Sequence, residues 1–261
     1  MSVDFNEEKE FDLFLLIQQC NFEKLTELFA IHYFPDVNVL KEYHQNGIFI
    51  AARYIRDDSQ CLKMISFLIN HQLNPLLIDS NKQNVLFFTC AAGLIETTKY
   101  LYENFAFDKY QVDIMKETPL FYAVKYNRVD IVNYLYSKGF DINHQNVYGE
   151  NCLFSLNGKK KVEMTKCLLN KGIDINNRGR DGITFLQFVN KVGWFDILNV
   201  IEGIDENESP DNKCFILIKK KMNGEEHDNH TIYDILENNT NHNEKNKDEE
   251  NSDSEILDIN S

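Results

Sequence analysis

An internal repeat of about 33 residues constrains this chain more than any other feature. Four segments align with one another, at 83–108, 116–143, 149–176 and 181–203. In each segment, the leucine that opens the predicted first helix is followed, at the same distance every time, by a second aliphatic residue. The pairs are Leu86 and Leu101, Leu120 and Leu135, Leu153 and Leu168, and Leu186 and Ile201. One such unit cannot bury its apolar face alone, so we predict a stack of units that share a continuous core.

The unit at 116–143 has the clearest local signals. Thr118 and Pro119 predict the start of a helix, with a capping hydroxyl followed by a first-turn proline. A second helix is predicted over 129–137, where the apolar residues recur at helical spacing. Gly139 then supplies a left-handed stop, after which we expect 140–143 to leave as an extended strand.

The same unit resembles the ankyrin-repeat family, whose first helix opens with Thr-Pro-Leu-His-x-Ala and whose second helix leads into Gly-Ala-Asp-x-Asn. The matching residues are Thr118, Pro119, Leu120, Ala123, Gly139, Asp141 and Asn143, whereas Phe121 replaces the histidine of the family. The resemblance implies an all-α solenoid of helix–turn–helix units joined by β-turn fingers. Each unit is expected to open with a helix at the leucine named above.

Weaker copies extend the repeat toward the N-terminus. We assign residues 1–204 to the ankyrin-repeat domain, with a cap pair at about 10–45 and repeats at 46–78, 79–111, 112–145, 146–178 and 179–204. Residues 55–59 are expected to be an insertion between the helices of the 46–78 repeat. Residues 205–239 are predicted to hold a further insertion and a degenerate C-terminal cap. The acidic residues 240–261 are predicted to be a disordered tail.

No pattern of catalytic, cofactor-binding or metal-binding residues occurs at a diagnostic spacing, so we expect no enzymatic activity, cofactor or metal. His227 and His230 lack a supporting framework of cysteines or carboxylates. The six cysteines contain no Cys-x-x-Cys pair, and Cys152 and Cys167 occupy repeat core positions. We therefore predict buried, reduced thiols and a cytoplasmic or nuclear location. No apolar stretch approaches the length of about 20 residues that a membrane helix needs.

The formal net charge of −14 argues against nucleic acid as the partner. Two lysine triplets, at 159–161 and 219–221, keep open the alternative of an RNA-associated protein that also uses Arg178 and Arg180. A second alternative is a regulatory subunit of an enzyme complex, in which the tail docks another protein.

The resemblance also implies where a partner binds. In this family, the finger tips and the exposed side of each first helix form a concave binding surface. The corresponding residues here are Asn81, Gln83, Ile114, Met115, Lys125, Tyr126, Val147, Tyr148, Lys159, Arg178, Arg180 and Lys191. We expect a non-catalytic scaffold or adaptor, monomeric by itself, that binds a protein partner mainly through Ile114, Met115, Tyr126 and Tyr148. The alternative is that these side chains pack against the adjoining unit.

Overall fold

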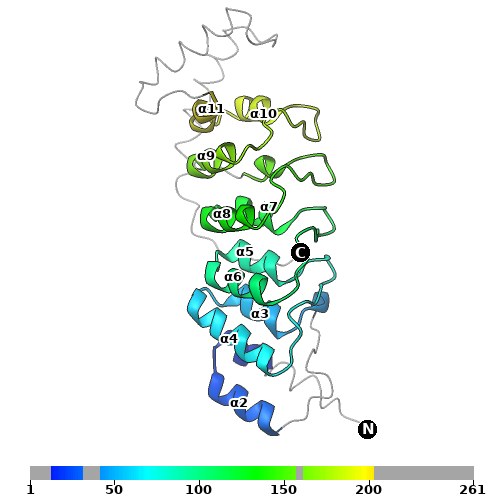
Figure 1. Cartoon of the computed structure of the whole chain (residues 1–261), viewed down its shortest axis with the longest axis vertical. Coiled ribbons are helices and arrows are strands. Elements are labelled where there is room, and N and C mark those ends of the chain that lie inside the picture. Colours follow the sequence, from blue (N-terminus) through cyan, green and yellow to red (C-terminus); the bar gives the residue numbers. More distant parts are fainter. Residues whose placement is uncertain (1–12, 32–41, 157–160, 203–261) are drawn as a thin grey trace, which may run out of the picture. The chain divides into compact units, whose positions relative to one another are not determined.

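The computed structural model describes residues 13–31, 42–156 and 161–202, all within one compact unit, residues 1–203. Helix pairs stack on one another through this unit (Figure 1). The elements are helical residues 13–18, α2 (Phe22–Ile31), η1 (Glu42–His44), α3 (Gly47–Tyr54), α4 (Asp58–Asn70), α5 (Val85–Ala92), α6 (Ile95–Asn104), α7 (Pro119–Lys125), α8 (Val129–Ser137), η2 (Cys152–Ser155), α9 (Val162–Asn170), α10 (Phe185–Lys191) and α11 (Phe195–Glu202). The described residues contain no β-strand.

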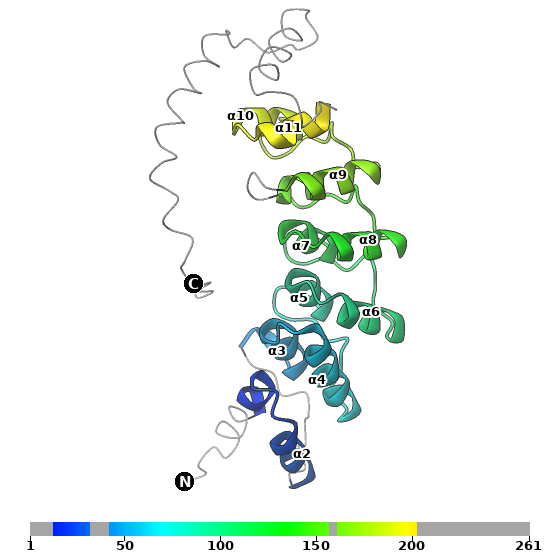
Figure 2. The same cartoon turned by 90° about the vertical axis from the view of Figure 1, so that its left-hand side faces the viewer.

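The helices form two layers (Figure 2). The first helix of each pair contacts the first helix of the next, in the order α3, α5, α7 and η2. The second helices make a parallel series, in the order α4, α6, α8, α9 and α11. The loops that join one pair to the next project beside the first helices (Figure 1). This arrangement confirms the predicted all-α repeat fold.

Polar side chains cap most of the first helices. Asn46, Asn84 and Asn151 each accept a hydrogen bond from the backbone N–H two residues later, at 3.0 to 3.2 Å. Thr184 forms a capping box with Gln187. These caps satisfy backbone donors that have no partner within the helix.

The predicted cap at Thr118 is wrong. Its side chain makes no capping hydrogen bond, and its buried hydroxyl has no hydrogen-bond partner. Pro119 stands at the first position of the helix, where its fixed φ already suits a helix and its missing N–H leaves one donor fewer to satisfy. The helix therefore begins at residue 119 because of the proline.

The second helices carry an acidic residue in the first turn at Glu96, Asp130, Glu163 and Asp196, where it interacts favourably with the helix dipole. The structure confirms the helix predicted over 129–137 and the left-handed Gly139, whose φ is 79°. The strand expected over 140–143 is wrong. Asp141 Oδ1 instead accepts a hydrogen bond from Asn143 N at 2.9 Å, so an Asp-x-Asn turn bends the chain there.

The pair that begins near residue 150 departs from the expected first helix. Only one 3-10 turn, η2, forms after the Asn151 cap. Leu156 occupies the place that small Ala123 holds one unit earlier, and Asn157 and Gly158, which follow it, have low helix propensity. The unit nevertheless keeps the repeat period, because stacking, and not helix length, sets that period.

The expected insertion at 55–59 is shorter than predicted. Helix α3 ends at Tyr54, and α4 already begins at Asp58, with Asp57 as its cap. Asp57 Oδ1 accepts a hydrogen bond from Gln60 N at 2.8 Å. Part of the extra sequence therefore lengthens α4 to 13 residues, whereas α6 has 10.

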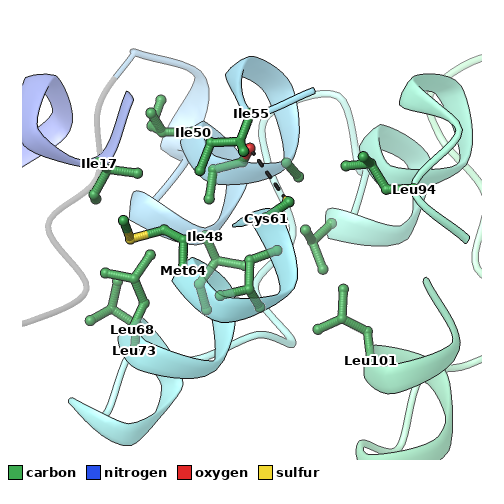
Figure 3. Close-up of a cluster of buried hydrophobic side chains, with 14 of the residues drawn as sticks. Ile17, Ile48, Ile50, Ile55, Cys61, Met64, Leu68, Leu73, Leu94 and Leu101 are labelled. Carbon is green, nitrogen blue, oxygen red and sulfur yellow. Dashed lines mark hydrogen bonds between the residues drawn. The ribbon is translucent and has the colours of Figure 1, made fainter. Parts of the chain in front are cut away.

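The core lies between the two helix layers. Near α3 and α4, Met64 and Leu68 are fully buried, and Cys61 Sγ donates to Ala51 O at 3.6 Å (Figure 3). Burial raises the pKa of the Cys61 thiol to about 12, so the thiol stays protonated at neutral pH. Cys152 is also fully buried, as predicted.

Two predicted core residues are less buried than expected. Cys167 is only half-buried, and its Sγ lies 3.4 Å from Asn133 Oδ1. In α10, Leu186 is half-buried as well, because its neighbour Phe185 turns into the core and packs edge-on against Phe154.

Candidate functional site

Four tight loops, here called fingers, project between the helix pairs, at residues 79–83, 113–117, 146–150 and 179–183. In the second finger, Asp113 Oδ1 accepts hydrogen bonds from Met115 N at 2.8 Å and Glu117 N at 2.9 Å. Asp79 and Asn146 do the same in their own fingers, and all three side chains are buried. Gly179 begins the fourth finger without such a side chain, yet keeps the backbone bond to Ile183 O at 3.0 Å. The backbone hydrogen bond between the first and last residues of a finger therefore keeps its shape even without the capping side chain.

Backbone hydrogen bonds also join one finger to the next. Ile114 N donates to Asn81 O at 3.0 Å, and Val147 N donates to Met115 O at 2.9 Å. In the fourth finger, Arg180 N donates to the Glu150 side chain, with a distance of 3.4 Å to Oε1. These contacts align the tips in a row and fix which side chains are neighbours.

A side-chain contact recurs at the base of the fingers. Gln45 Nε2 donates to Asp79 Oδ2 at 2.8 Å, and Gln83 Nε2 lies 3.5 Å from Asp113 Oδ2. At the next interface the types are exchanged, because a carboxylate, Glu117, stands opposite an amide, Asn146, which lowers its pKa in part. An amide therefore faces a carboxylate at all three positions. Sequence reasoning missed this contact, although the exchange of types at repeat spacing could have revealed it.

One predicted partner-binding residue is part of this contact. Gln83 is only 9% exposed, and besides Asp113 its amide reaches the hydroxyl of Tyr122. Tyr122 in turn donates to Asp113 Oδ2 at 2.8 Å. Gln83 thus packs against the adjoining unit and does not project from a tip, so its assignment as an exposed tip residue is wrong.

The half-buried Glu117 has a perturbed carboxyl group. Burial raises its pKa above the ordinary value, and the nearby charge of Asp113 raises it further. Lys125 and the hydrogen bond from Asn146 lower the pKa in part. The charged form of Glu117 is therefore less favourable in the folded chain than in the unfolded chain.

Replacing Glu117 by glutamine should raise the melting temperature at neutral pH. The folded pKa is raised, so the contribution of Glu117 to stability is fully present below the unfolded pKa and is lost as pH rises through the folded pKa. We expect a gain below about 1 kcal/mol, since the side chain is partly exposed. Melting curves from pH 3 to pH 8 should show this gain vanish under about pH 4. A glutamine variant that is less stable at neutral pH would contradict the stated cause.

The remaining predicted tip residues differ in exposure. Ile114, Val147 and Tyr148 are 54%, 44% and 38% exposed, whereas Asn81 and Met115 are half-buried. Arg180 is exposed and covers the ring of Tyr148, with Cζ 3.5 Å from the ring centroid. Together, Ile114, Met115, Val147, Tyr148 and Arg180 form the finger surface.

Arg178 does not stand at a tip. It precedes the fourth finger and forms an isolated antiparallel bridge with Thr184. Its Nη1 atom donates to Gly182 O at 2.7 Å, which holds the exposed guanidinium against the finger. Arg178 and Arg180 therefore flank Gly179, the first residue of the fourth finger.

The predicted helix positions lie near the ends of the first helices. Lys125 ends α7, Tyr126 follows it with 44% of its surface exposed, and Lys191 ends α10. Lys159 lies outside the described residues. Exposed Tyr54, at the corresponding end of α3, was not predicted, although it stands as far after the Asn46 cap as Tyr126 does after Thr118.

Two basic residues between paired helices have a structural role. Arg128 Nε donates to Ala91 O at 3.0 Å, and Lys161 Nζ donates to Lys125 O. Each side chain reaches a carbonyl near the C-terminal end of the first helix in the preceding unit, α5 for Arg128 and α7 for Lys161. A positive charge is favourable at the C-terminal end of a helix. Burial lowers the pKa of Lys161, and so does the charge of Lys125. One lysine of the 159–161 triplet is thus occupied in packing.

Exposed apolar side chains gather on the side of the fingers. Most of the large ones belong to fingers, to the loops beside them, or to the ends of first helices: Tyr43, Tyr54, Leu76, Ile78, Tyr110, Ile114, Tyr126, Val147, Tyr148 and Val192. Such a concentration is typical of a surface that binds another protein.

Across the described ranges, no group of three or more His, Cys, Asp or Glu side chains could hold a metal ion. No described helix is long and apolar enough to cross a membrane. His227 and His230 lie outside these ranges.

Comparison with known proteins agrees with this geometry. Residues 48–146 match a family model of ankyrin repeats in three copies. The fold is similar to that of an ankyrin repeat domain from Acinetobacter baumannii AYE, at 19% identity and a TM-score of 0.60, over 75% of this chain and 98% of that one. It is also similar to the ankyrin repeat protein EF0377, at 20% identity and a TM-score of 0.61, over 74% of this chain and 97% of that one. A comparison with curated protein sequences gives no match.

Proposed function

The chain is an ankyrin-repeat protein, and we propose that it is a non-catalytic adaptor that binds a protein partner on its finger surface. Ankyrin repeats generally mediate protein–protein interaction and are generally not catalytic. The observation that carries the proposal is the row of exposed Ile114, Val147 and Tyr148 on neighbouring fingers. Aromatic and aliphatic side chains of this kind dominate the energy of protein interfaces once a partner removes water from them.

The rigidity of the fingers supports the same proposal. Their tips are tied by backbone hydrogen bonds, and their bases are held by buried Asp79, Asp113 and Asn146. A surface that is already ordered loses little conformational entropy on binding. The finger surface is therefore suited to present the same side chains to a partner every time.

Two alternative functions, RNA association and regulation of an enzyme complex, predict different observations. An RNA-associated protein would need Arg178, Arg180 and the lysine triplets, but Lys161 is engaged with a backbone carbonyl. RNA binding would also weaken steeply with salt, because phosphate contacts release counterions. A regulatory subunit would co-purify with a catalytic chain.

Photo-cross-linking tests the proposal directly. Benzoylphenylalanine placed at Val147 should capture a discrete protein from an extract of the source cell. The matched control places the same group at Tyr136, which is similarly exposed but lies on α8, a second helix. Capture from Tyr136 with equal or greater yield, or capture of RNA from Val147, would contradict a protein-binding finger surface.

A further inference from the structure

Two guanidinium groups, one on the fourth finger and one just before it, are held in place without an acidic partner. Arg180 lies over the Tyr148 ring, and Arg178 is fixed by its hydrogen bond to Gly182 O. Within the described ranges, the ion pairs join Lys99 to Glu96 and Lys138 to Glu103, and neither pair involves the fourth finger. An acidic chain thus presents two exposed cations that form no ion pair with a described carboxylate.

Stacking leaves the binding edge of Arg180 available. The aromatic face attracts the guanidinium and covers one side of its plane, while the N–H donors point outward along that plane. The Glu150 carboxylate accepts hydrogen bonds from Arg180 N and from Asn146 Nδ2, and it forms no ion pair with either arginine. The exposed Asp181 forms no ion pair with either arginine. A planar, ordered fork of donors is the arrangement that binds a carboxylate through two hydrogen bonds.

The neighbouring tips are apolar. Beside Arg180, the same position in the preceding fingers is held by Val147 and then by Ile114, both exposed. The row of tips therefore changes from aliphatic to cationic in the direction of the C-terminus. A segment lying along this row would need a bulky aliphatic residue next to an acidic one.

We infer that the finger surface binds an extended acidic segment of a protein partner, with a carboxylate on Arg180, close in the chain to Arg178, and an aliphatic side chain against Val147 and Ile114. This inference rests on the proposed function and names the chemistry of the partner. The net charge of −14 would repel an acidic segment at a distance. Salt screens that repulsion beyond about 8 Å at physiological ionic strength, so the local arginine contacts decide the outcome.

A labelled peptide tests the inference. The probe is a synthetic fluorescein-labelled peptide with an Ile-Leu pair flanked on both sides by Asp and Glu, and the control peptide has Asn and Gln in place of every acid. Fluorescence anisotropy with the full chain at about 0.15 M salt should show the acidic peptide binding at least tenfold more tightly. Equal affinity for the two peptides, or no binding of the acidic peptide, would overturn the inference.

Variants of the full chain locate the contact. Arg180→Gln should weaken the acidic peptide about tenfold and leave the control peptide unchanged. Arg180→Lys should lose nearly as much, because lysine keeps the charge but not the planar fork. Lys99→Gln removes a cation from α6 and should change neither affinity. Equal losses for Arg180→Gln and Lys99→Gln would show a general charge effect and overturn the site.

A final arm separates this inference from the proposed function. A single-stranded RNA oligonucleotide could bind more tightly than the acidic peptide, with the same dependence on Arg180. That result would overturn the inference that Arg180 binds a carboxylate, because the ligand would then be a phosphate. If the acidic peptide does not bind while benzoylphenylalanine at Val147 still captures a protein, the adaptor function stands, and the inference that the partner segment is acidic is wrong.

Discussion

Leu135→Ala is expected to lower the free energy of unfolding by about 2 to 5 kcal/mol. Leu135 is completely buried in α8, which packs against both α6 and α9. Removing its side chain leaves a cavity in a core that neighbouring units share, and those units can close around it only in part. Because each unit depends on its neighbours, the loss should weaken the stack on both sides.

Tyr136→Leu is the matched control, since Tyr136 follows on the same helix but is exposed. It should change the free energy by less than about 1 kcal/mol, mostly by removing the contact of its ring with Lys171. Urea unfolding followed by circular dichroism gives both values. An unchanged unfolding midpoint for Leu135→Ala would place this residue outside the shared core.

The repeat period made much of the fold predictable from sequence. The same nearly constant step separates the opening leucines, from Leu86 to Leu186, and again the finger bases, from Asp79 to Gly179. Helix α8 and the left-handed Gly139 followed from apolar spacing and glycine chemistry, which are local properties. The shortened η2 was missed because the alignment preserves register even where the Asn-Gly pair that follows Leu156 weakens a helix.

The candidate site was harder to predict, because its contacts cross between units. Gln83 reads as a polar loop residue, and only the position of Asp113, in the next finger, shows that it is buried. The stacking of Arg180 on Tyr148 likewise joins two fingers. Exposure of Ile114 and Val147 was expected from the resemblance, but their binding of a partner stays a prediction.

The double variant Ile114→Asp Val147→Asp tests the central claim most directly. The partner captured at Val147 is purified, and its affinity for the full chain is measured by isothermal titration calorimetry. We expect a loss of about 100-fold or more, since each aspartate puts a charge where an apolar contact is buried. Circular dichroism should show the double variant folded, because both side chains are exposed. Tyr136→Asp, on the opposite helix layer, should change the affinity less than about twofold. Equal affinity of the double variant and the original chain would contradict binding on the finger surface.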